Sequence, residues 1–213
     1  TQDGNLRKDT SDNELKKWLF TKYDGLNRPV LTGILTRDSV KTQQQMQQIV
    51  DGLYSGSSPR SYFVERDSTL SSSLGFTNVS FPSSADGSLE YLTATYYDNY
   101  LFPNVKSFDN AVNISGFTYG SLSYFDKLTG VVTGTKVKVL ETSAYITTTN
   151  YYDDKYRIVQ TLKNLYDASD GQEIMSNKYD FTGSVLCARQ KQTYSGAATT
   201  VDKYYSYDHS GRL

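Results

Sequence analysis

Short runs of apolar and β-branched residues, separated by polar turns at regular intervals, dominate the last third of the 213-residue chain and predict β-strands there. Aromatic and β-branched residues are frequent in these runs. Two strands and two turns fit into each repeat of roughly 27 residues, which favours an antiparallel meander of hairpins and leaves no sequence for crossover helices. The predicted strands are Lys136–Leu140, Ala144–Tyr152, Tyr156–Leu162, Glu173–Tyr179, Ser184–Lys191 and Thr199–Tyr207.

The first part of the chain is less regular. A hairpin is predicted over residues 14–35, because strand-like runs flank a turn at residues 24–27 that is rich in Asp, Gly and Asn. Residues 54–88 are rich in Ser, Gly and Asn and are predicted as loops around a short element at Tyr62–Val64. A strand is expected at Leu89–Tyr97.

One helix is predicted near residues 39–51. Asp38 or Ser39 could cap its first amides, and Gly52 is placed for a left-handed C-terminal cap. The fold class is therefore expected to be mostly all-β, with one helix packed on or beside a curled sheet of hairpins. The chain divides into a frayed end or upstream tail at residues 1–13, a hairpin, helix, loops and degenerate repeats at 14–143, and regular repeats at 144–213.

A Tyr-Asp signature recurs four times, and its last three copies begin 27 and 28 residues apart, a period typical of stacked supersecondary units. The Tyr ends a strand and can pack against the next repeat, while the Asp can accept bonds from backbone amides two residues on. The third residue after the Asp needs φ > 0, because the chain reverses there. The Arg that follows it can pair with the Asp or lie over a neighbouring Tyr ring. The residues concerned are Tyr23, Asp24, Asn27 and Arg28; Tyr152, Asp153 and Arg157; Tyr179, Asp180 and Gly183; and Tyr207, Asp208, Gly211 and Arg212.

Two copies depart from this pattern. Tyr156 stands where Gly is usual and Ser184 where Arg is usual, so these two turns are expected to differ in shape. Degenerate copies are predicted at Tyr97-Asp98 and Phe125-Asp126, although Gly130 comes one place late for the second. A separate class of turn is predicted at Asp170-Gly171 and Ser195-Gly196.

Composition and charge limit the possible partners. The 22 basic and 23 acidic residues give a net charge of −1, so no overall field attracts nucleic acid or an anionic membrane. No apolar run approaches the roughly 20 residues that span a bilayer. A single cysteine, Cys187, excludes an internal disulfide framework. Because no initiating Met or secretory signal is present, the sequence is interpreted as a fragment of a longer protein.

The pattern Tyr-Asp-x-x-Gly-Arg, clearest at Tyr207–Leu213, resembles the YD repeat of bacterial Rhs proteins, which also occurs in Tc toxin C components and in teneurins. Asn150–Arg157 and Asn177–Gly183 are similar to segments of large bacterial cell-surface Rhs-type proteins. The resemblance covers residues 144–213 strongly and 15–35 fairly. It implies a β-shell around a toxic C-terminal segment, as in polymorphic toxins, and an extracellular or cell-surface location in bacteria. No catalytic residue is carried over from the self-cleaving region of these relatives.

The leading functional prediction is a non-enzymatic scaffold segment whose partner is the remainder of the same polypeptide. The alternative is an adhesin-like or carbohydrate-binding module that uses exposed Tyr side chains. An enzyme is not expected, because His209 is the only histidine and is interpreted as an exposed turn residue, and Cys187 as a small buried side chain. No cofactor or metal is predicted, since the acidic turns at Asp153-Asp154 and residues 167–171 lack the ligand pattern of a calcium loop.

Overall fold

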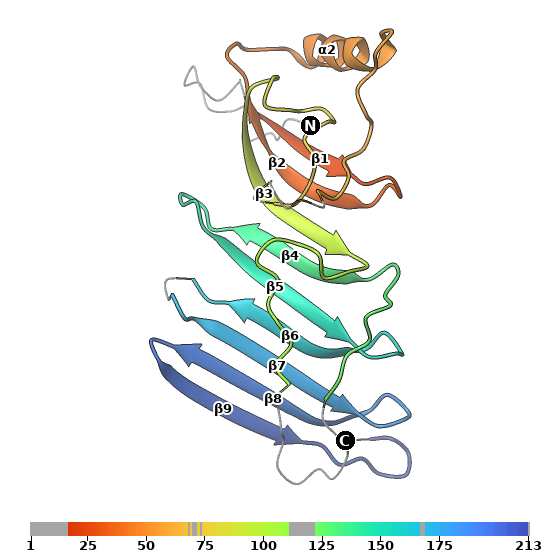
Figure 1. Ribbon diagram of the computed structural model, residues 1–213, viewed down its shortest axis with the longest axis vertical. Helices are drawn as coiled ribbons and strands as arrows, with labels where there is room; N and C mark the ends of the chain where they lie inside the picture. The colour runs from red at the N-terminus through yellow and green to blue at the C-terminus, as the bar shows by residue number, and fades with distance from the viewer. Residues whose placement is uncertain are drawn as a thin grey trace. The chain divides into compact units, whose positions relative to one another are not determined.

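The computed structural model describes residues 17–67, 69, 72, 74–110, 122–166 and 169–212, and the structural statements below concern these residues. They form nine antiparallel strands and one helix (Figure 1), which confirms the mostly β fold class predicted from the sequence. The chain divides into two compact units, residues 1–95 and 96–213, and within each the strands lie in sequence order. The one described helix is too short and too polar to cross a membrane.

The first unit contains β1 (Lys17–Tyr23), β2 (Pro29–Thr36), α2 (Gln43–Ser55) and most of β3 (Ser88–Tyr97). The second unit contains the end of β3 and six further strands: β4 (Val132–Lys138), β5 (Tyr145–Tyr152), β6 (Ile158–Asn164), β7 (Gln172–Tyr179), β8 (Val185–Tyr194) and β9 (Ala197–Tyr204). All the strands predicted from the sequence are present, with ends that differ by a few residues.

The core of the first unit lies on one face of the predicted N-terminal hairpin. Trp18 of β1 is opposite Leu35 of β2, and Leu35 is in turn opposite Leu89 of β3, so these apolar side chains share a face. Met46 of α2 packs onto this cluster, together with the partly buried Phe81 from the loop that precedes β3. Met46 is the one buried side chain of the helix, and the Tyr54 hydroxyl adds a bond from the Phe81 amide.

The helix begins four residues later than the sequence prediction. Thr42 is its N-cap, and a reciprocal capping box joins Thr42 and Gln45, whose amide-to-side-chain bonds measure 2.9 and 3.2 Å. Asp38 and Ser39 precede the helix, so their predicted capping role is wrong. Gly52 lies inside the helix and is not its C-terminal cap. The capping box satisfies two amides at once, which explains why the later start is preferred.

The predicted short element at Tyr62–Val64 is not a strand. This segment instead bends past the first hairpin, where the Val64 amide donates to the Tyr23 carbonyl at 2.9 Å. The nearest β-pairing in the loop is an isolated bridge between Arg66 and Phe76. This bond, the full burial of Val64 and the bonds between Glu65 and Thr77 together position this part of the loop.

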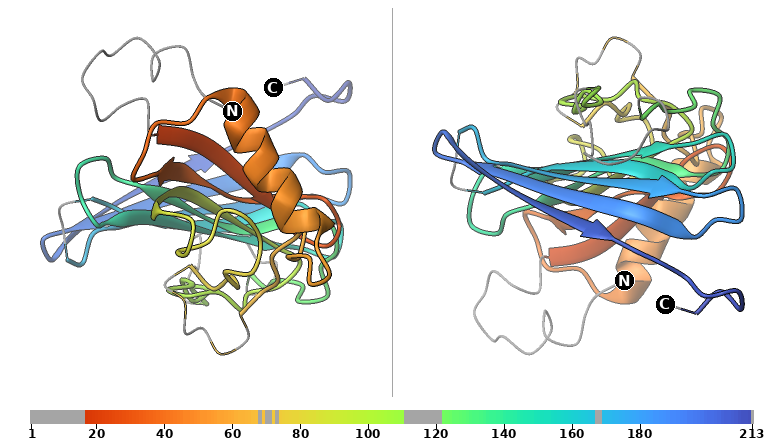
Figure 2. Two further views of the ribbon diagram at one scale, coloured as in Figure 1. Left: turned by 90° about the horizontal axis from the view of Figure 1, so that it is seen from above. Right: turned by 90° about the horizontal axis from the view of Figure 1, so that it is seen from below.

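The second unit is a regular antiparallel sheet, and residues 98–110 and 122–131, from the segment between β3 and β4, cover part of one face (Figures 1 and 2). Tyr151 of β5 is the centre of the contact, because Tyr100 stacks on its ring at 4.5 Å and Phe108 meets it edge-on at 5.1 Å. Leu162 and Ile174 from the next two strands complete the buried cluster.

Polar bonds fix the same covering segment to the sheet. The Tyr151 hydroxyl donates to the Lys106 carbonyl at 2.7 Å, and the Lys106 amide donates to Thr149 Oγ1 at 3.0 Å. The fully buried Gln160 side chain bonds to Asp109 through both its oxygen, at 2.8 Å, and its nitrogen, at 3.3 Å. These side chains replace strand pairing for residues 104–109, which form no helix or strand.

Candidate functional site

The four Tyr-Asp turns, residues 23–28, 152–157, 179–184 and 207–212, share one backbone arrangement. In each copy the amide of the Asp donates to the carbonyl four residues later at 2.9–3.0 Å. Three carboxylates, those of Asp24, Asp153 and Asp208, also accept from the amides two and four residues later at 2.8–3.0 Å. The Asp therefore closes the turn from both its backbone and its side chain.

The hydrogen bonds also favour the ionised carboxylate. The amide and then the guanidinium of Arg212 lower the pKa of Asp208. Burial alone would raise the pKa of Asp24, but the bonds from the amide and side chain of Arg28 outweigh it and hold the pKa below its usual value. The turns at Asp24 and Asp208 are consequently strongest when the Asp is charged.

A positive φ occurs at the same place in all four turns. The values are 59° at Asn27, 60° at Tyr156, 102° at Gly183 and 73° at Gly211. Tyr156 therefore adopts the left-handed conformation although its side chain disfavours it, and its turn keeps the common hydrogen bonds. The expectation that Tyr156 changes the shape of its turn is wrong, because the surrounding bonds determine the backbone.

Ser184 changes the side-chain bonds of its turn but not the backbone. Asp180 Oδ1 accepts from the amides of Thr182, Gly183 and Ser184 at 2.8–2.9 Å, and from the Thr182 hydroxyl at 2.7 Å. The Thr182 hydroxyl is the main cause that lowers the pKa of Asp180. Thr182 thus supplies part of what Arg provides in the other copies.

The Arg of the motif pairs with its own Asp in the three copies that contain it. The shortest nitrogen-to-carboxylate distances are 2.7 Å at Arg28, 2.7 Å at Arg157 and 2.8 Å at Arg212. Arg157 also reaches the following turn: its guanidinium lies 4.6 Å from the Tyr179 ring centroid, and its Nη1 donates to the Asp180 carbonyl at 2.9 Å. One side chain therefore joins two consecutive turns.

In three of the four copies the Tyr hydroxyl joins its turn to the preceding hairpin. These hydroxyls donate to the carbonyl of the first residue of an earlier strand: Tyr152 to Val132 at 2.7 Å, Tyr179 to Ile158 at 2.9 Å and Tyr207 to Val185 at 3.1 Å. Burial is the largest cause that raises the pKa values of Tyr152 and Tyr179. Asn150 and Asn177, two residues before these tyrosines, donate to the same carbonyls at 3.4 Å. The repeat is therefore better described as Asn-x-Tyr-Asp in these two copies.

A fifth, related turn is split by a long segment. The Asp98 amide donates to the Val131 carbonyl at 3.1 Å, and Gly130, with φ of 80°, donates its amide to Asp98 Oδ1 at 2.6 Å. The bond of the Asp98 amide is the one seen in all four regular copies, and the Gly130 bond matches that of Gly183 to Asp180. Asp98 differs in having a positive φ of 72°, and residues 99–129 stand in place of the usual two. The degenerate copy predicted at Tyr97-Asp98 is therefore a turn, and the one predicted at Phe125-Asp126 is wrong because Gly130 belongs to Asp98.

The Tyr-Asp turns lie at one end of the strands, and at the other end an Asp side chain also links two turns, those at residues 169–171 and 195–196. The Asp170 carboxylate accepts from the amides of Ser195 and Gly196 at 3.0 and 2.6 Å. Ser195 and Gly196 have φ of 48° and 79°, the conformation of a tight two-residue hairpin. Neighbouring turns are thus bonded to each other on both sides of the second unit.

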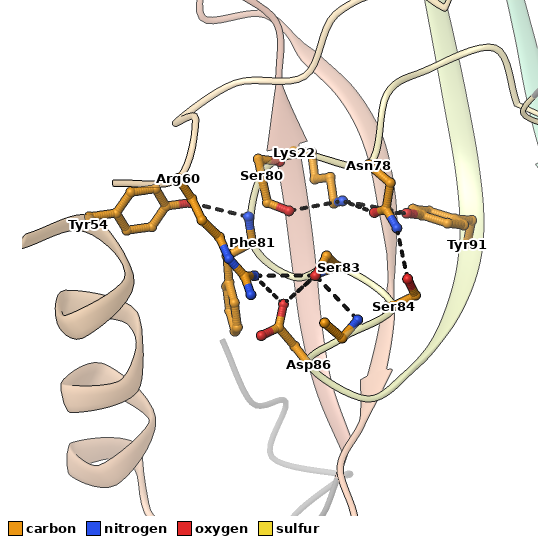
Figure 3. A network of polar contacts seen from close by, with 11 residues as sticks. Lys22, Tyr54, Arg60, Asn78, Ser80, Phe81, Ser83, Ser84, Asp86 and Tyr91 are labelled. Atoms are coloured by element: carbon orange, nitrogen blue, oxygen red, sulfur yellow. Dashed lines mark hydrogen bonds and ion pairs between the residues drawn. The ribbon is translucent and has the colours of Figure 1, made fainter. Parts of the chain in front are cut away.

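A buried lysine forms the main polar network of the first unit (Figure 3). Lys22 is only 2% exposed, and its Nζ donates to Asn78 Oδ1 at 3.2 Å, the Ser80 carbonyl at 3.4 Å and the Tyr91 hydroxyl at 3.5 Å. Burial lowers the pKa of Lys22 to about 8, while the nearby Asp86 carboxylate acts in the opposite direction. Sequence reasoning missed this site, because its partners lie more than 50 residues from Lys22 along the chain.

An ion pair lies beside this network. Arg60 pairs with the Asp86 carboxylate, which also accepts from the Ser83 amide at 2.7 Å and the Ser83 hydroxyl at 2.9 Å. Burial would raise the pKa of Asp86, but the bonds from Arg60 and Ser83 outweigh it and lower the pKa. The pair fixes the loop that precedes β3 and supplies the nearest charges to Lys22.

Asn78 and Tyr91 also line an open pocket of about 600 Å³, together with Asp67, Leu74 and Phe76. The side chains of Asn78 and Tyr91 bond to Lys22 and to each other, at 3.4 Å. Asp67 accepts from the amides of Thr69 and Ser72, both at 3.0 Å. The polar groups on this wall thus hold the loop in place.

The residues weighed as catalytic or metal-binding candidates lie apart. His209 is an exposed turn residue, and Cys187 is buried in β8, where burial raises the pKa of its thiol. Within the described ranges, His, Cys, Asp and Glu side chains form no group of three that could hold a metal ion. Asp167 lies outside the described residues, so the acidic turn at 167–171 is seen only in part.

Comparisons with known proteins give no match: no family model, no curated protein and no solved structure resembles this chain significantly.

Proposed function

We propose that this chain is a structural segment of a secreted or cell-surface protein of the Rhs type, in which YD repeats build a β-scaffold that encloses or displays other domains. The observation that carries the proposal is the common bonding of the four Tyr-Asp turns. A motif that keeps one geometry through four copies is typical of a repeat architecture.

The polar groups of the motif support a structural role. The Asp carboxylates accept from backbone amides of their own turns, and the Tyr152, Tyr179 and Tyr207 hydroxyls donate to backbone carbonyls of earlier strands. Arg157 joins two turns through its guanidinium. These polar groups are bonded to other groups of the same chain, as expected for a structural repeat. A ligand site, in contrast, does not require its polar groups to be bonded within the chain.

The expected partner is the rest of the polypeptide, including an enclosed or displayed segment such as a toxin domain. The test is limited proteolysis of the full-length protein, with the double variant D153A/D180A compared with H209A. Loss of two turn carboxylates should loosen the array and speed cleavage of the partner segment, whereas H209A should behave as the wild type. Equal cleavage rates in all three proteins would refute the scaffold, as would robust catalytic turnover by this segment alone.

Carbohydrate binding is the second candidate, and one observation favours it. Tyr62 is 72% exposed and stacks on Tyr54 with ring centroids 4.4 Å apart and planes at 14°. The Tyr54 hydroxyl accepts from the Phe81 amide at 3.2 Å, so the lower ring is held in place. The outer face of Tyr62 offers the kind of flat aromatic surface on which a sugar ring can stack.

A glycan array tests this candidate. Saturable binding should disappear in Y62A and persist in Y194A, which removes a Tyr that is 47% exposed on β8. The candidate fails if no glycan binds, or if both variants lose binding equally.

A further inference from the structure

Lys22 and Asn78 bring an amine and a side-chain amide into direct contact inside the first unit (Figure 3). Lys22 Nζ lies 3.2 Å from Asn78 Oδ1, the oxygen of the amide carbonyl. The two residues meet because β1 carries the lysine and the loop that precedes β3 carries the asparagine. An amine held against an amide carbonyl is an arrangement from which a new amide bond can form.

Two aromatic rings enclose the amine. Lys22 Nζ lies 5.9 Å from the ring centroid of Phe20 and 5.7 Å from that of Tyr91. Gly33 of β2 is opposite Phe20 on one side and Tyr91 on the other, and a Cβ there would lie 2.6 Å from the Phe20 ring. The lack of a side chain at Gly33 therefore lets the two rings meet, with centroids 5.6 Å apart. Their apolar surface keeps water away from the amine.

The surroundings favour the neutral, nucleophilic form of this amine. The groups that accept bonds from Lys22 Nζ are an amide, a carbonyl and a hydroxyl, all of them neutral. The nearest charged groups, Asp86 and Arg60, pair with each other and act on Lys22 in opposite directions. Burial has the largest effect and lowers the pKa of Lys22 to about 8. About a tenth of the amine is then neutral at pH 7 and about half at pH 8.

The groups around Asn78 suit the same reaction. The Tyr91 hydroxyl donates to Asn78 Oδ1 at 3.4 Å and accepts from Lys22 Nζ at 3.5 Å. It can therefore stabilise the negative charge that develops on Oδ1 during an attack on the carbonyl carbon, and it can relay a proton. Asn78 Nδ2 points to Ser84 Oγ, 3.4 Å away, and Asn78 is exposed and lines the open pocket. The leaving nitrogen thus has a path to solvent.

We propose that Lys22 and Asn78 form an intramolecular amide cross-link. Lys22 Nζ attacks Asn78 Cγ, so that the Nζ–Cγ bond forms and the Cγ–Nδ2 bond breaks. One proton passes from Nζ to Nδ2, which leaves as ammonia, and the reaction needs no oxidant, cofactor or second protein. The product ties β1 covalently to the loop that precedes β3. It lies beyond the scaffold proposal, because it involves none of the Tyr-Asp turns.

Lys22 titrates only until this bond has formed, because an amide nitrogen carries no proton that ionises in the same range. The pH dependence that Lys22 gives to stability therefore belongs to chains that have not yet reacted.

Mass spectrometry of the purified 213-residue chain tests the cross-link. The intact mass should lie below the calculated mass by one ammonia, about 17 Da. Trypsin cleaves after Lys and Arg except before Pro, so the bond should join residues 18–37 to residues 67–106 in one branched peptide. Cleavage after Lys22 should be lost in this peptide.

Variants assign the loss of ammonia to these two side chains. K22R and N78A should both have their calculated masses, whereas N99A, which removes an Asn of the second unit, should still lose ammonia. N78A changes an exposed residue, so it serves even where K22R disturbs the buried site. The thermal midpoint of N78A should lie about 10 °C below that of N99A, because the cross-link closes a long loop.

Y91F separates the reaction from folding. It keeps the ring beside Nζ but loses the hydroxyl that contacts both reacting groups. In freshly translated chain followed by intact mass, the cross-link should form at least about tenfold more slowly in Y91F than in the wild type. Equal rates would show that the Tyr91 hydroxyl takes no part.

Two results would overturn the cross-link itself. One is a folded wild-type chain of unchanged mass that trypsin cleaves after Lys22. The other is a loss of ammonia that persists in K22R, which would assign it to cyclisation of an asparagine with its own backbone.

Discussion

Replacing Arg157 by Ala removes three interactions at once, and their sizes can be estimated from the structure. The ion pair with Asp153 at 2.7 Å is partly exposed and contributes about 0.5 kcal/mol. The bond from Nη1 to the Asp180 carbonyl, at 2.9 Å, contributes about 1 kcal/mol. The cation–π contact with Tyr179 adds about 0.5 kcal/mol. The expected loss is about 2 kcal/mol in the free energy of unfolding.

Arg212→Ala is the matched control, because Arg212 has the same place in its turn and an equivalent ion pair but no described following turn. It should cost at most about 0.5 kcal/mol, as expected for an exposed pair. Urea unfolding followed by far-ultraviolet circular dichroism measures both variants. A loss of about 2 kcal/mol lowers the urea midpoint by about 1 M when the slope is near 2 kcal/mol per molar. Equal midpoints for the two variants would refute the reasoning that Arg157 joins consecutive turns.

Four further expectations follow from the same contacts. S184R should raise the urea midpoint, since it supplies the guanidinium that the preceding repeat uses to reach the next turn; a lower midpoint would contradict this. Y156G should stabilise the chain by up to about 1 kcal/mol, because the position has φ of 60°, and G183V should destabilise it far more than H209A, with thermal midpoints as the measure. The unfolded chain keeps the proton of Lys22 to about pH 10.5 whereas the folded chain releases it near pH 8, so stability should rise with pH across this window by about 3 kcal/mol. The fluorescence of the single tryptophan reports this rise, and K22M should show no such slope.

The regular repeats were predictable because their signals are local. Runs of aromatic and β-branched residues between recurring turns located the strands, and the turn residues were correct at Asp24, Asp153 and Asp208, where the Asp bonds to amides two and four residues away. The helix was found, but its start was misplaced by four residues, because the capping box of Thr42 outweighs the isolated polar residues before it. Motifs of this kind can be recognised from a single short stretch of sequence.

The features that sequence reasoning missed depend on residues far apart in the chain. The turn that joins Asp98 to Gly130 encloses 31 other residues, so the short motif that identifies the other turns is broken. The inward position of Lys22 depends on Asn78 and Tyr91, which approach it only after the first unit has folded. Side chains alternate along β1, so Lys22 lies on the same face of the strand as the buried Trp18. Buried positions are usually apolar, so sequence reasoning does not expect a lysine there.

The central claim is that the Tyr-Asp turn is the structural unit of this chain, and hydrogen exchange tests it most directly. The amides of Asp24, Asp153, Asp180 and Asp208 each donate to a carbonyl four residues later, so peptides that cover the four turns should exchange slowly, like the adjoining strands. The exposed loop at residues 56–59 is the internal reference for fast exchange. If the four turns exchange as fast as this loop, the turns are not the units that hold the sheet together.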